Sequence, residues 1–566
     1  MNMPRIASSR PALLAIALLL SLAPPLCARQ AATDGRRAPL LTAGQWQADL
    51  DSLLSGLRQT HRNVFHTVTP ARFDSAAAAL RARLPGLQRH EAIMEFARLA
   101  ALVGDGHTNV APTRDAAIGF QELPVAFYVF EEGMFIRAAR RDLAELAGAR
   151  VLRIGDASAA DALARVTPYI GRDNAMGALY FAPHLLAMPE VLHTLGLAPS
   201  PDSARLELEV HGAPRVVWLR AAGPAPLMPA DTDRSWRPRA GWVDARDATP
   251  GQDPLWLRQA PDTVLWWMTT VPGTRVVYVQ INQVRDGERE LFETFVQRVF
   301  ERLDRGPVDR LILDLRLNRG GNGELRDPLV RGLLKRPQVN ARGRLFVLLG
   351  RSTWSAAQFL LDDLQGYSDA ILVGEPSASR GNHYGDSRRI RLPNSGITAR
   401  ASTRWWQHWS PEDSRPWTAP EVSVPLGFAD YRAKRDPVLE AALHWKPRPP
   451  LAAELATMLG RGDSAGAVAR VRAVRSSARD RYVDALQALL DAGAQLYRHH
   501  DPKASAAAFS VAAAEYPESV DAHLRAGLVQ AELGRTDAAR RSLERVLELE
   551  PGNTTARERL GALTGR

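Results

Sequence analysis

Cysteine is nearly absent from this chain of 566 residues. The single cysteine, Cys27, lies in a segment that we expect to be removed from the mature protein. A mature chain without cysteine has no disulfide bond, no thiolate nucleophile and no cysteine-ligated metal. Catalytic chemistry, if the chain has any, must therefore come from other residue types.

Lysine is also scarce, since only Lys335, Lys434, Lys446 and Lys503 stand among 72 basic residues. The scarcity limits which catalytic mechanisms can use a lysine base. The arginines bring the net charge to +10, but they are scattered through predicted helices and loops. Because a nucleic-acid-binding surface usually gathers its basic residues into a dense patch or stripe, we expect no nucleic acid partner.

Residues 1–28 are predicted to form a secretory signal peptide. Two arginines precede an apolar run from Ala12 to Ala23, and Ala28 is a small residue suited to cleavage. This run is too short to span a membrane, and no later run is longer. We therefore expect a periplasmic or secreted protein with no integral membrane segment after cleavage. Lipid attachment at Cys27 is the competing interpretation, although the two prolines before it make a poor approach to such a site.

Composition and periodicity divide the first half of the mature chain into four regions. Residues 29–42 are polar and are predicted to be a disordered linker. Residues 43–115 place apolar side chains at helical spacing and are predicted to form a helical domain. Residues 116–225 mix strand and helix patterns, which predicts a mixed α/β region. Residues 226–263 are rich in Pro, Arg, Asp and Trp and are predicted to be a long connection.

Residues 264–446 carry the clearest alternation of strands and helices. Val276 to Ile281, Leu311 to Leu315 and Leu345 to Leu349 are predicted strands, and Glu290 to Leu303 is a predicted helix between two of them. Such alternation favours parallel strands joined by crossover helices. The sequence therefore predicts an α/β core in this region.

The tail, residues 447–566, shows no strand pattern and repeats with a period of 34 residues. A repeat of this length is typical of tetratricopeptide helix pairs, which bind protein partners on a concave face. We therefore expect an all-α domain that recruits a partner or substrate. The positions that recur are Gly493, Gly527 and Gly561, Pro517 and Pro551, and Phe509 and Leu543.

Two turns of the predicted core could hold chemistry. Ser355 follows a predicted strand and opens a predicted helix, where free backbone N–H groups and the helix dipole favour an oxyanion. Gly320-Gly321 follows another strand and lets the backbone approach a neighbouring group closely. The structural alternatives are helix capping by Ser352, Thr353 or Ser355, and an ordinary glycine loop.

Three motifs in this region resemble those of the S41 peptidase family. They are Leu311-Ile312-Leu313-Asp314-Leu315-Arg316 with Asn318 and Gly320-Gly321, Gly350-Arg351-Ser352-Thr353-Trp354-Ser355-Ala356-Ala357-Gln358, and Gly374-Glu375-Pro376. They stand in the order of the family, and the resemblance covers roughly residues 43–445.

The resemblance implies a fold and a set of roles. It implies a multidomain α/β protein with a ClpP/crotonase-like S41 catalytic core, a helical N-terminal region and an all-α tetratricopeptide-like tail. Ser355 would be the nucleophile, and the N–H groups of Gly321 and Ala356 would form the oxyanion hole. The segment Gly148 to Ile154 and the helix after it resemble the PDZ-like insert of the family more weakly.

The chain differs from the tail-specific members of the family in its catalytic base. Those members use a serine/lysine dyad. The corresponding position here is Arg380, and arginine cannot lose its proton in a protein. The tricorn-like members instead take a histidine from an earlier segment. Gly104-Asp105-Gly106-His107-Thr108 resembles that element, so His107 is the predicted base, with His383 and His408 as competitors.

A carboxylate that orients the histidine would complete a triad. The resemblance places it in the segment after the last core helices, where Asp413 is favoured over Glu412 and Glu421. A solvated loop carboxylate is the alternative for each of them. Asp314 is predicted to be structural, buried at a strand end and paired with a donor such as Arg316.

These observations lead to one expected function and two alternatives. We expect an exported serine peptidase that hydrolyses peptide bonds through Ser355, His107 and Asp413, with no metal and no cofactor. The alternatives are a catalytically silent S41-like scaffold protein and a hydrolase of non-peptide esters or amides. No phosphate loop is predicted, because no Gly-Lys-Ser/Thr follows the glycines at 320–323.

Overall fold

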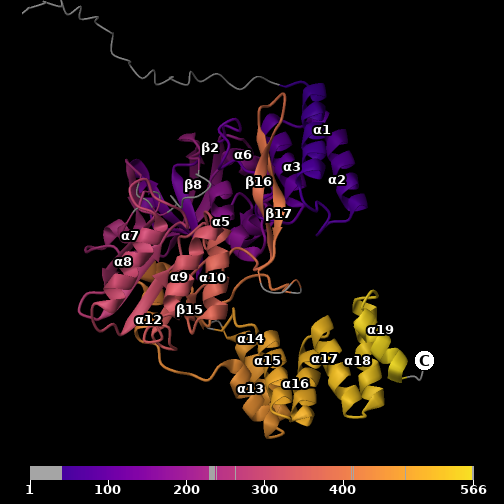
Figure 1. Cartoon of the computed structure of the whole chain (residues 1–566). Helices are drawn as coiled ribbons and strands as arrows, with labels where there is room; N and C mark the ends of the chain where they lie inside the picture. Colours follow the sequence, from indigo (N-terminus) through magenta and orange to yellow (C-terminus); the bar gives the residue numbers. More distant parts are fainter. Residues whose placement is uncertain are drawn as a thin grey trace, which may run out of the picture. The chain divides into compact units, whose positions relative to one another are not determined.

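The computed structural model describes residues 41–563, apart from 228–235, 237–238, 260, 262, 409–410, 412 and 478–479. The predicted signal peptide, residues 1–28, and nearly all of the predicted linker, residues 29–42, lie outside this part of the chain. Within the described residues, no helix combines the length and the apolar character that crossing a membrane requires. Figure 1 shows the arrangement of the elements.

The N-terminal region is helical, as predicted. Thr42 and Gln45 form a capping box at the start of the first helix, and Thr69 caps the second, whose first residue is Pro70. The apolar faces pack together, and Trp46 lies edge-on to Phe96. The helices are α1 (Ala43–Thr60), α2 (Pro70–Arg83) and α3 (Arg89–Ala101).

A long hairpin from late in the chain packs against these helices. It consists of β16 (His383–Arg391) and β17 (Thr398–Trp406), and β17 pairs with β1 (Asn109–Val110). Figure 1 shows the hairpin beside α1 and α3. Ile390 fits against Gly56 of α1, where an added Cβ would lie 2.5 Å from it. The predicted core region, 264–446, therefore contributes a hairpin that belongs structurally to the N-terminal helices.

The region after α3 forms a second sheet of mixed strand lengths, flanked by short helices. It is antiparallel throughout, and its buried residues join the same hydrophobic core as the N-terminal helices. The strands are, in order, β10 (Trp242–Asp244), β4 (Gly133–Arg140), β5 (Arg150–Ile154), β7 (Ser203–Val210) and β8 (Ala213–Arg220), with β3 (Val125–Phe130) and β6 (Ala157–Ser158) paired beside them. The helices are α4 (Ala159–Val166), α5 (Ala175–Leu186) and α6 (Pro189–Thr194), and β2 (Gln121–Glu122) pairs with β9 (Gly223–Pro224).

The predicted α/β core is a six-stranded sheet whose central strands are parallel. Successive residues point to opposite faces, so that Leu311 and Leu313 pack with the helices of one face while Ile312 packs on the other. Both faces are buried, which explains the continuous apolar runs in the sequence. Strand order is β11 (Trp266–Thr270), β12 (Val276–Ile281), β13 (Arg310–Asp314), β14 (Leu345–Leu349), β15 (Ile371–Gly374) and β18 (Val422–Ser423).

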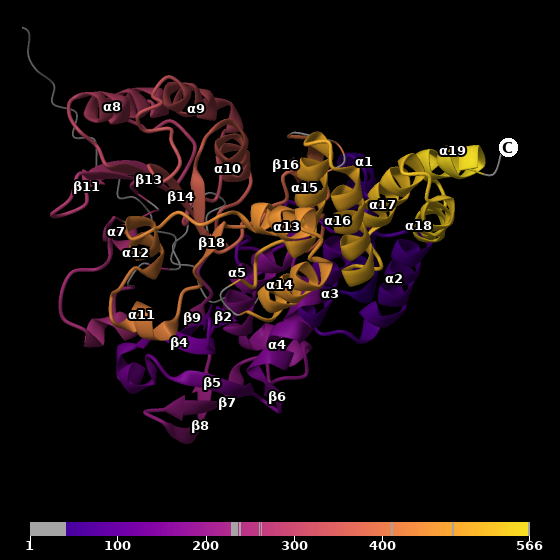
Figure 2. The ribbon, with the colours of Figure 1, turned by 90° about the horizontal axis from the view of Figure 1, so that it is seen from below.

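Helices cover both faces of this sheet, and Figure 2 shows one group on either side. The β12 and β14 boundaries match the predicted strands, and the helix between β12 and β13 matches within two residues at its start and one at its end. The antiparallel edge strand β11 was not predicted. One face is covered by α8 (Phe292–Asp304), α9 (Asp327–Leu334) and α10 (Ala356–Tyr367). The other face is covered by α12 (Pro437–Leu443), together with Leu255 of α7 (Leu255–Arg258). The short helix α11 (Phe428–Arg432) packs through Tyr431 in a separate cluster with Trp256 of α7.

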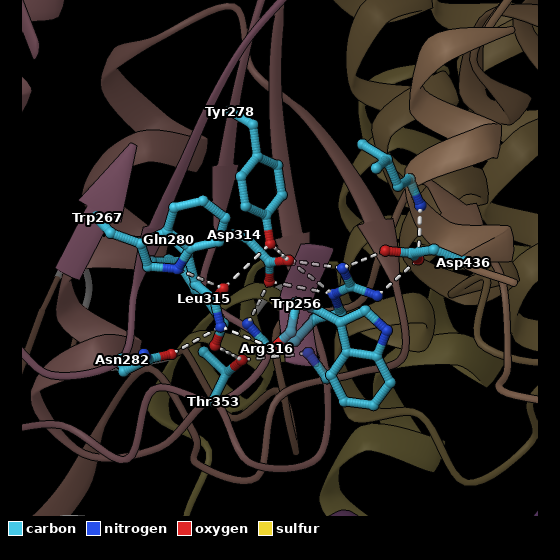
Figure 3. Close-up of polar contacts among 12 residues, drawn as sticks. Trp256, Trp267, Tyr278, Gln280, Asn282, Asp314, Leu315, Arg316, Thr353 and Asp436 are labelled. Atoms are coloured by element: carbon cyan, nitrogen blue, oxygen red, sulfur yellow. Dashed lines mark hydrogen bonds and ion pairs between the residues drawn. The ribbon is translucent and has the colours of Figure 1, made fainter. Parts of the chain in front are cut away.

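A buried ionic network fixes the carboxyl end of β13. Arg316 Nη2 lies 2.6 Å from Asp314 Oδ2, and Arg316 Nη1 lies 2.8 Å from Asp436 Oδ1. Tyr278 donates a hydrogen bond of 2.6 Å to Asp314 (Figure 3). The predicted structural role of Asp314, with Arg316 as its partner, is therefore confirmed. Each charge in this network is paired and hydrogen-bonded. The network therefore fixes the backbone where β13 ends and the turn at Gly320-Gly321 begins.

The described part of the tail is helical, and its repeated glycines have a packing role. A Cβ built on Gly493 would lie 2.6 Å from the Phe509 ring, and one built on Gly527 would lie 2.8 Å from Leu543. Glycine therefore lets the two helices of each pair approach closely at the same place in successive repeats. The helices are α13 (Leu451–Gly460), α14 (Ser464–Ser476), α15 (Ala485–Arg498), α16 (Pro502–Glu515), α17 (Val520–Glu532), α18 (Thr536–Leu549) and α19 (Thr554–Leu563).

We expect Gly493→Ala to destabilise the tail by about 1–3 kcal/mol, because the methyl group must displace the Phe509 ring. Gly460→Ala is the matched control, since its Cβ would meet Leu496 at an ordinary 3.6 Å. Helix propensity alone would make either change stabilising by about 0.5–1 kcal/mol. Urea unfolding followed by far-UV circular dichroism measures both. Equal effects of the two substitutions would contradict the packing role.

Candidate active site

Ser355 sits in a strained turn between β14 and α10. Its backbone angles are φ 59° and ψ −126°, a conformation that costs a non-glycine residue about 1–3 kcal/mol. The side chain makes no capping bond to the helix, while the backbone N–H donates to Ser379 Oγ at 3.1 Å. The helix-capping alternative is therefore wrong for Ser355, and the turn presents its hydroxyl away from the helix backbone.

Bonds on either side of Ser355 hold this turn. Thr353 Oγ1 donates to the carbonyl of Leu315 at 2.8 Å and accepts from Gly350 N–H at 3.1 Å. Trp354 N–H donates to the carbonyl of Asn318. The turn after β14 is thus tied to the turn after β13, and Figure 3 shows Thr353 beside Leu315 at that junction.

His107 reaches Ser355 from the N-terminal region. Its Nε2 lies 3.0 Å from Ser355 Oγ, within hydrogen-bond range. The two residues are 248 positions apart in the chain. The structure thus brings together the predicted nucleophile and the predicted base. For Nε2 to accept the hydroxyl proton, the ring proton must be on Nδ1.

The loop that carries His107 is held by a buried carboxylate, Asp105. Its Oδ1 accepts hydrogen bonds from the backbone N–H groups of His107 and Thr108, both at 2.8 Å, and from Ser402 Oγ at 2.7 Å. Its Oδ2 lies 2.9 Å from His61 Nε2. Burial alone would raise the pKa of Asp105, but the bonds from His61, Ser402 and Thr108 outweigh it and hold the pKa below its usual value. Asp105 therefore remains an anion that fixes the loop.

Flat side chains hold the His107 ring. Trp354 stacks on it with centroids 4.0 Å apart, and His383 lies nearly parallel on another side at 5.8 Å. Burial lowers the pKa of His107 to about 3, with repulsion from His383 and Arg114 acting in the same direction and Asp105 opposing them. The imidazole is thus neutral at physiological pH, which is the form a general base requires.

Asp173 links the two halves of the site and was not anticipated from the sequence. Its Oδ1 accepts from Gly106 N–H at 2.7 Å, and its carboxyl group is hydrogen-bonded with Ser379, the residue that accepts from Ser355 N–H. Burial, and then repulsion from Asp105, raises the pKa of Asp173 to about 7. Asp173 therefore bridges the histidine loop and the serine turn.

The predicted orienting acid, Asp413, is not in contact with His107. Its carboxylate is paired with Arg415, with an Oδ2–Nη2 distance of 2.7 Å. Among the described residues, no carboxylate is bonded to His107 Nδ1, and the backbone of Tyr384 is the hydrogen-bonding group that favours the charged ring. The prediction of an Asp413–His107 bond is therefore wrong, because the neighbouring arginine takes the carboxylate. Of the alternatives, Glu421 pairs with Arg342, and Glu412 lies outside the described residues.

The competing bases are occupied elsewhere. His383 Nδ1 lies 2.9 Å from the carbonyl of Arg380, and His408 Nε2 lies 3.1 Å from Asp363. Arg380, at the position of the family lysine, donates from Nε to the backbone carbonyl of Asp173 at 3.0 Å. These contacts leave His107 as the histidine bonded to Ser355.

The glycine turn lies directly against Ser355. A Cβ built on Gly320 would be 2.8 Å from Ser355 Cβ and 3.0 Å from the backbone nitrogen of Ala356. Gly321 forms a bridge with Val284, in which Val284 N–H donates to Gly320 and Asn322 N–H donates to Val284. In a parallel bridge of this kind, the N–H of the middle residue faces away from the partner strand. The Gly321 N–H therefore faces away from Val284.

A cavity of about 700 Å³ adjoins the histidine loop. Asp173 and Gly104 line it on the side of the site, and three arginines, Arg72, Arg172 and Arg380, also line it. Space of this size next to the site can accept several side chains of a bound chain.

No family model matches the chain, and no curated protein matches it. Among solved structures, mature CPAF complexed with lactacystin is similar, with 14% identity, coverage of 69% of this chain and 96% of that chain, and a TM-score of 0.48. The photosystem II D1 C-terminal processing protease is similar with 14% identity, coverage of 67% and 93%, and a TM-score of 0.31. The first TPR of Spaghetti (RPAP3) bound to an HSP90 peptide matches 20% of this chain at 21% identity, with 88% of that chain covered and a TM-score of 0.15.

Proposed function

We propose that the chain is a serine peptidase in which Ser355 attacks the substrate carbonyl and His107 is the general base. The observation that carries this proposal is the 3.0 Å contact between His107 Nε2 and Ser355 Oγ. The neutral imidazole takes the hydroxyl proton as Oγ bonds to the carbonyl carbon. The imidazolium then returns the proton to the leaving amine, and water repeats the sequence on the acyl-enzyme.

The oxyanion of the tetrahedral intermediate would be held by backbone N–H groups of Ala356 and Gly321. Ala356 is the first residue of α10, so its N–H has no partner within the helix and points along the positive end of the dipole. Gly321 contributes from the turn packed on Ser355, with its N–H turned away from Val284. Preorganised donors of this kind supply a large part of catalysis in acyl transfer.

The catalytic unit proposed is a dyad. In place of a carboxylate on Nδ1, the ring of His107 is positioned by the Trp354 and His383 faces, and its backbone is fixed by Asp105. Asp105 and Asp173 are positioning residues, because each acts through the loop and neither touches Ser355 Oγ. This arrangement replaces the Ser-His-acid triad expected from the sequence.

The substrate proposed is a peptide or protein. The S41 resemblance implies this class, and the 700 Å³ cavity, which Gly104 and Asp173 line but Ser355 and His107 do not, offers room for residues of a bound chain at a distance from the scissile bond. On the same resemblance, the sheet around β3 to β8 would correspond to a PDZ-like insert, and the helical tail would recruit a protein partner. The predicted signal peptide places the reaction in the periplasm or outside the cell. The silent-scaffold alternative is less favoured, because His107 supplies the base that Arg380 cannot.

A fluorophosphonate probe should label the protein at Ser355. We expect Ser355→Ala to abolish labelling, and His107→Gln to slow labelling and peptide hydrolysis by at least about a thousand-fold, because each removes part of the proton-transfer unit. Ser200→Ala, at a half-buried serine in the turn before β7, is the matched serine control. A folded wild-type protein that the probe does not label would support the scaffold instead.

The substitutions Asp105→Asn and Asp413→Asn should show which of the two aspartates positions His107. His61 Nδ1 accepts from Asn63 N–H, so its Nε2 donates to Asp105, and an asparagine there cannot accept every bond now made. We expect Asp105→Asn to lower kcat by about 10²-fold with little change in KM, because the His107 loop shifts. Asp413→Asn should leave kcat near the wild-type value. The reverse order of effects would restore Asp413 as the orienting acid.

The acid limb of kcat/KM should lie far below the pKa of an ordinary histidine. Protonation of His107 removes the base, and burial holds its pKa near 3 rather than 6.5. Activity should therefore persist at pH 5 and fall only as the pH approaches the pKa of His107. Circular dichroism at each pH separates this loss from acid unfolding. An acid limb centred at pH 6.5 in folded protein would contradict the buried, neutral imidazole.

A further inference from the structure

Two histidines and a glutamate meet where α6 packs on α3, away from the proposed active site. His90 and Glu91 are in the first turn of α3, and His193 is in the last turn of α6. One ligand atom from each lies within 4.8 Å of the other two, and this is the one such grouping of His, Cys, Asp and Glu among the described residues. No local sequence motif marks this cluster, because the two histidines come from different helices.

The two imidazoles face each other through nitrogen. His90 Nε2 lies 2.8 Å from His193 Nδ1, and the rings are inclined at 60° with centroids 5.0 Å apart. Without a metal, one proton must lie between the two nitrogens, since two lone pairs would repel at this distance. The two facing nitrogens therefore form a ready pair of ligands for a cation that takes the place of the shared proton.

Two carboxylates and one guanidinium stand near the histidine pair. Glu91 Oε2 accepts from Gln88 N–H in the capping box of α3, so the glutamate is fixed at the helix start. Arg89 directs its guanidinium to the carbonyls of Ala117 and Ile118. Glu190, one turn before His193, accepts from Gln121 N–H. One carboxylate therefore joins the two nitrogens, and a second lies on the same helix as His193.

We propose that His90, His193 and Glu91 form a zinc site that clips α6 to α3. Two imidazoles and one carboxylate are an established zinc ligand set, in which water completes the tetrahedron. Zinc–nitrogen bonds of about 2.0–2.1 Å set the two nitrogens roughly 3.3 Å apart, so the rings need to separate by about half an ångström. As zinc binds, the shared proton moves by exchange with solvent to the outer nitrogen of its own ring, so each imidazole stays neutral and binds zinc through the nitrogen that faces the other ring. Nitrogen ligands favour zinc over calcium and magnesium, which prefer oxygen.

The site would stabilise the wall of the cavity. Helix α5 precedes α6 in the chain, and Ala175, Ala178 and Ala182 of α5 line the 700 Å³ cavity. Fixing α6 to α3 therefore restrains the segment that forms one wall. The role is structural, and the chemistry at Ser355 does not involve the metal.

Zinc retention by untagged, chelator-treated protein tests the proposal directly. After equilibration with micromolar zinc and gel filtration, we expect one zinc per wild-type chain by elemental analysis and a raised Tm. His90→Ala with His193→Ala should retain none. Glu91→Gln should weaken binding by about tenfold while keeping the capping box, because glutamine also caps. His523→Ala, at a half-buried histidine of α17 in the tail, is the matched control and should bind as the wild type does.

Two outcomes would overturn the site. One is a wild-type protein that keeps no stoichiometric zinc at these concentrations. The other is a folded Glu91→Gln or double-histidine variant that keeps zinc as tightly as the wild type. Ser355→Ala protein should bind zinc fully, so the result is independent of whether the peptidase proposal holds.

Discussion

The hydrogen bond between His107 and Ser355 depends on two loops that meet from opposite ends of the catalytic region. The serine turn is fixed by the parallel sheet, through Thr353 and the carbonyl of Leu315. The histidine loop is fixed by the N-terminal helices and the late hairpin, through Asp105, His61 and Ser402. Neither region alone contains both partners. A shift of either loop by about an ångström would lengthen the 3.0 Å contact beyond useful range.

Holding these two loops has a cost that the surrounding bonds offset. Ser355 is in a strained backbone conformation, and His107 is a half-buried polar ring whose Nδ1 is shielded from water. Each such feature is worth about 1–3 kcal/mol against folding. The buried ionic network of Arg316, and the bonds to Asp105, provide paired charges close to these positions. These interactions therefore stabilise the fold close to the two loops whose geometry the site requires.

Local patterns predicted much of the sheet, whereas Ser355 and His107 were predicted from the resemblance to the S41 family. The strands β12 and β14 and the helix after Ser355 follow from apolar runs and turn residues, which depend on neighbours in the sequence. The hairpin 383–406 was assigned to the core because its packing against α1, through Ile390 and Gly56, is a long-range contact that no local pattern encodes. Asp105 stood within the glycine-flanked motif, while Asp173 had no local signal. Asp413 was misassigned because its pairing with Arg415 is decided by side-chain geometry.

Among the described residues no acid contacts His107 Nδ1, and this has a consequence for the rate of the proposed reaction. In a triad, the carboxylate stabilises the imidazolium that forms during proton transfer. In the proposed dyad that charge would form in a half-buried ring next to His383 and Arg114, where the charge of Asp105 and then the backbone of Tyr384 would stabilise it. The oxyanion would form at the same moment on the substrate carbonyl. Because opposite charges attract, the pair would form together more easily than the imidazolium alone. Proton transfer in the proposed mechanism would therefore be coupled to formation of the oxyanion, and the hydroxyl would stay largely un-ionised until a substrate carbonyl is in place.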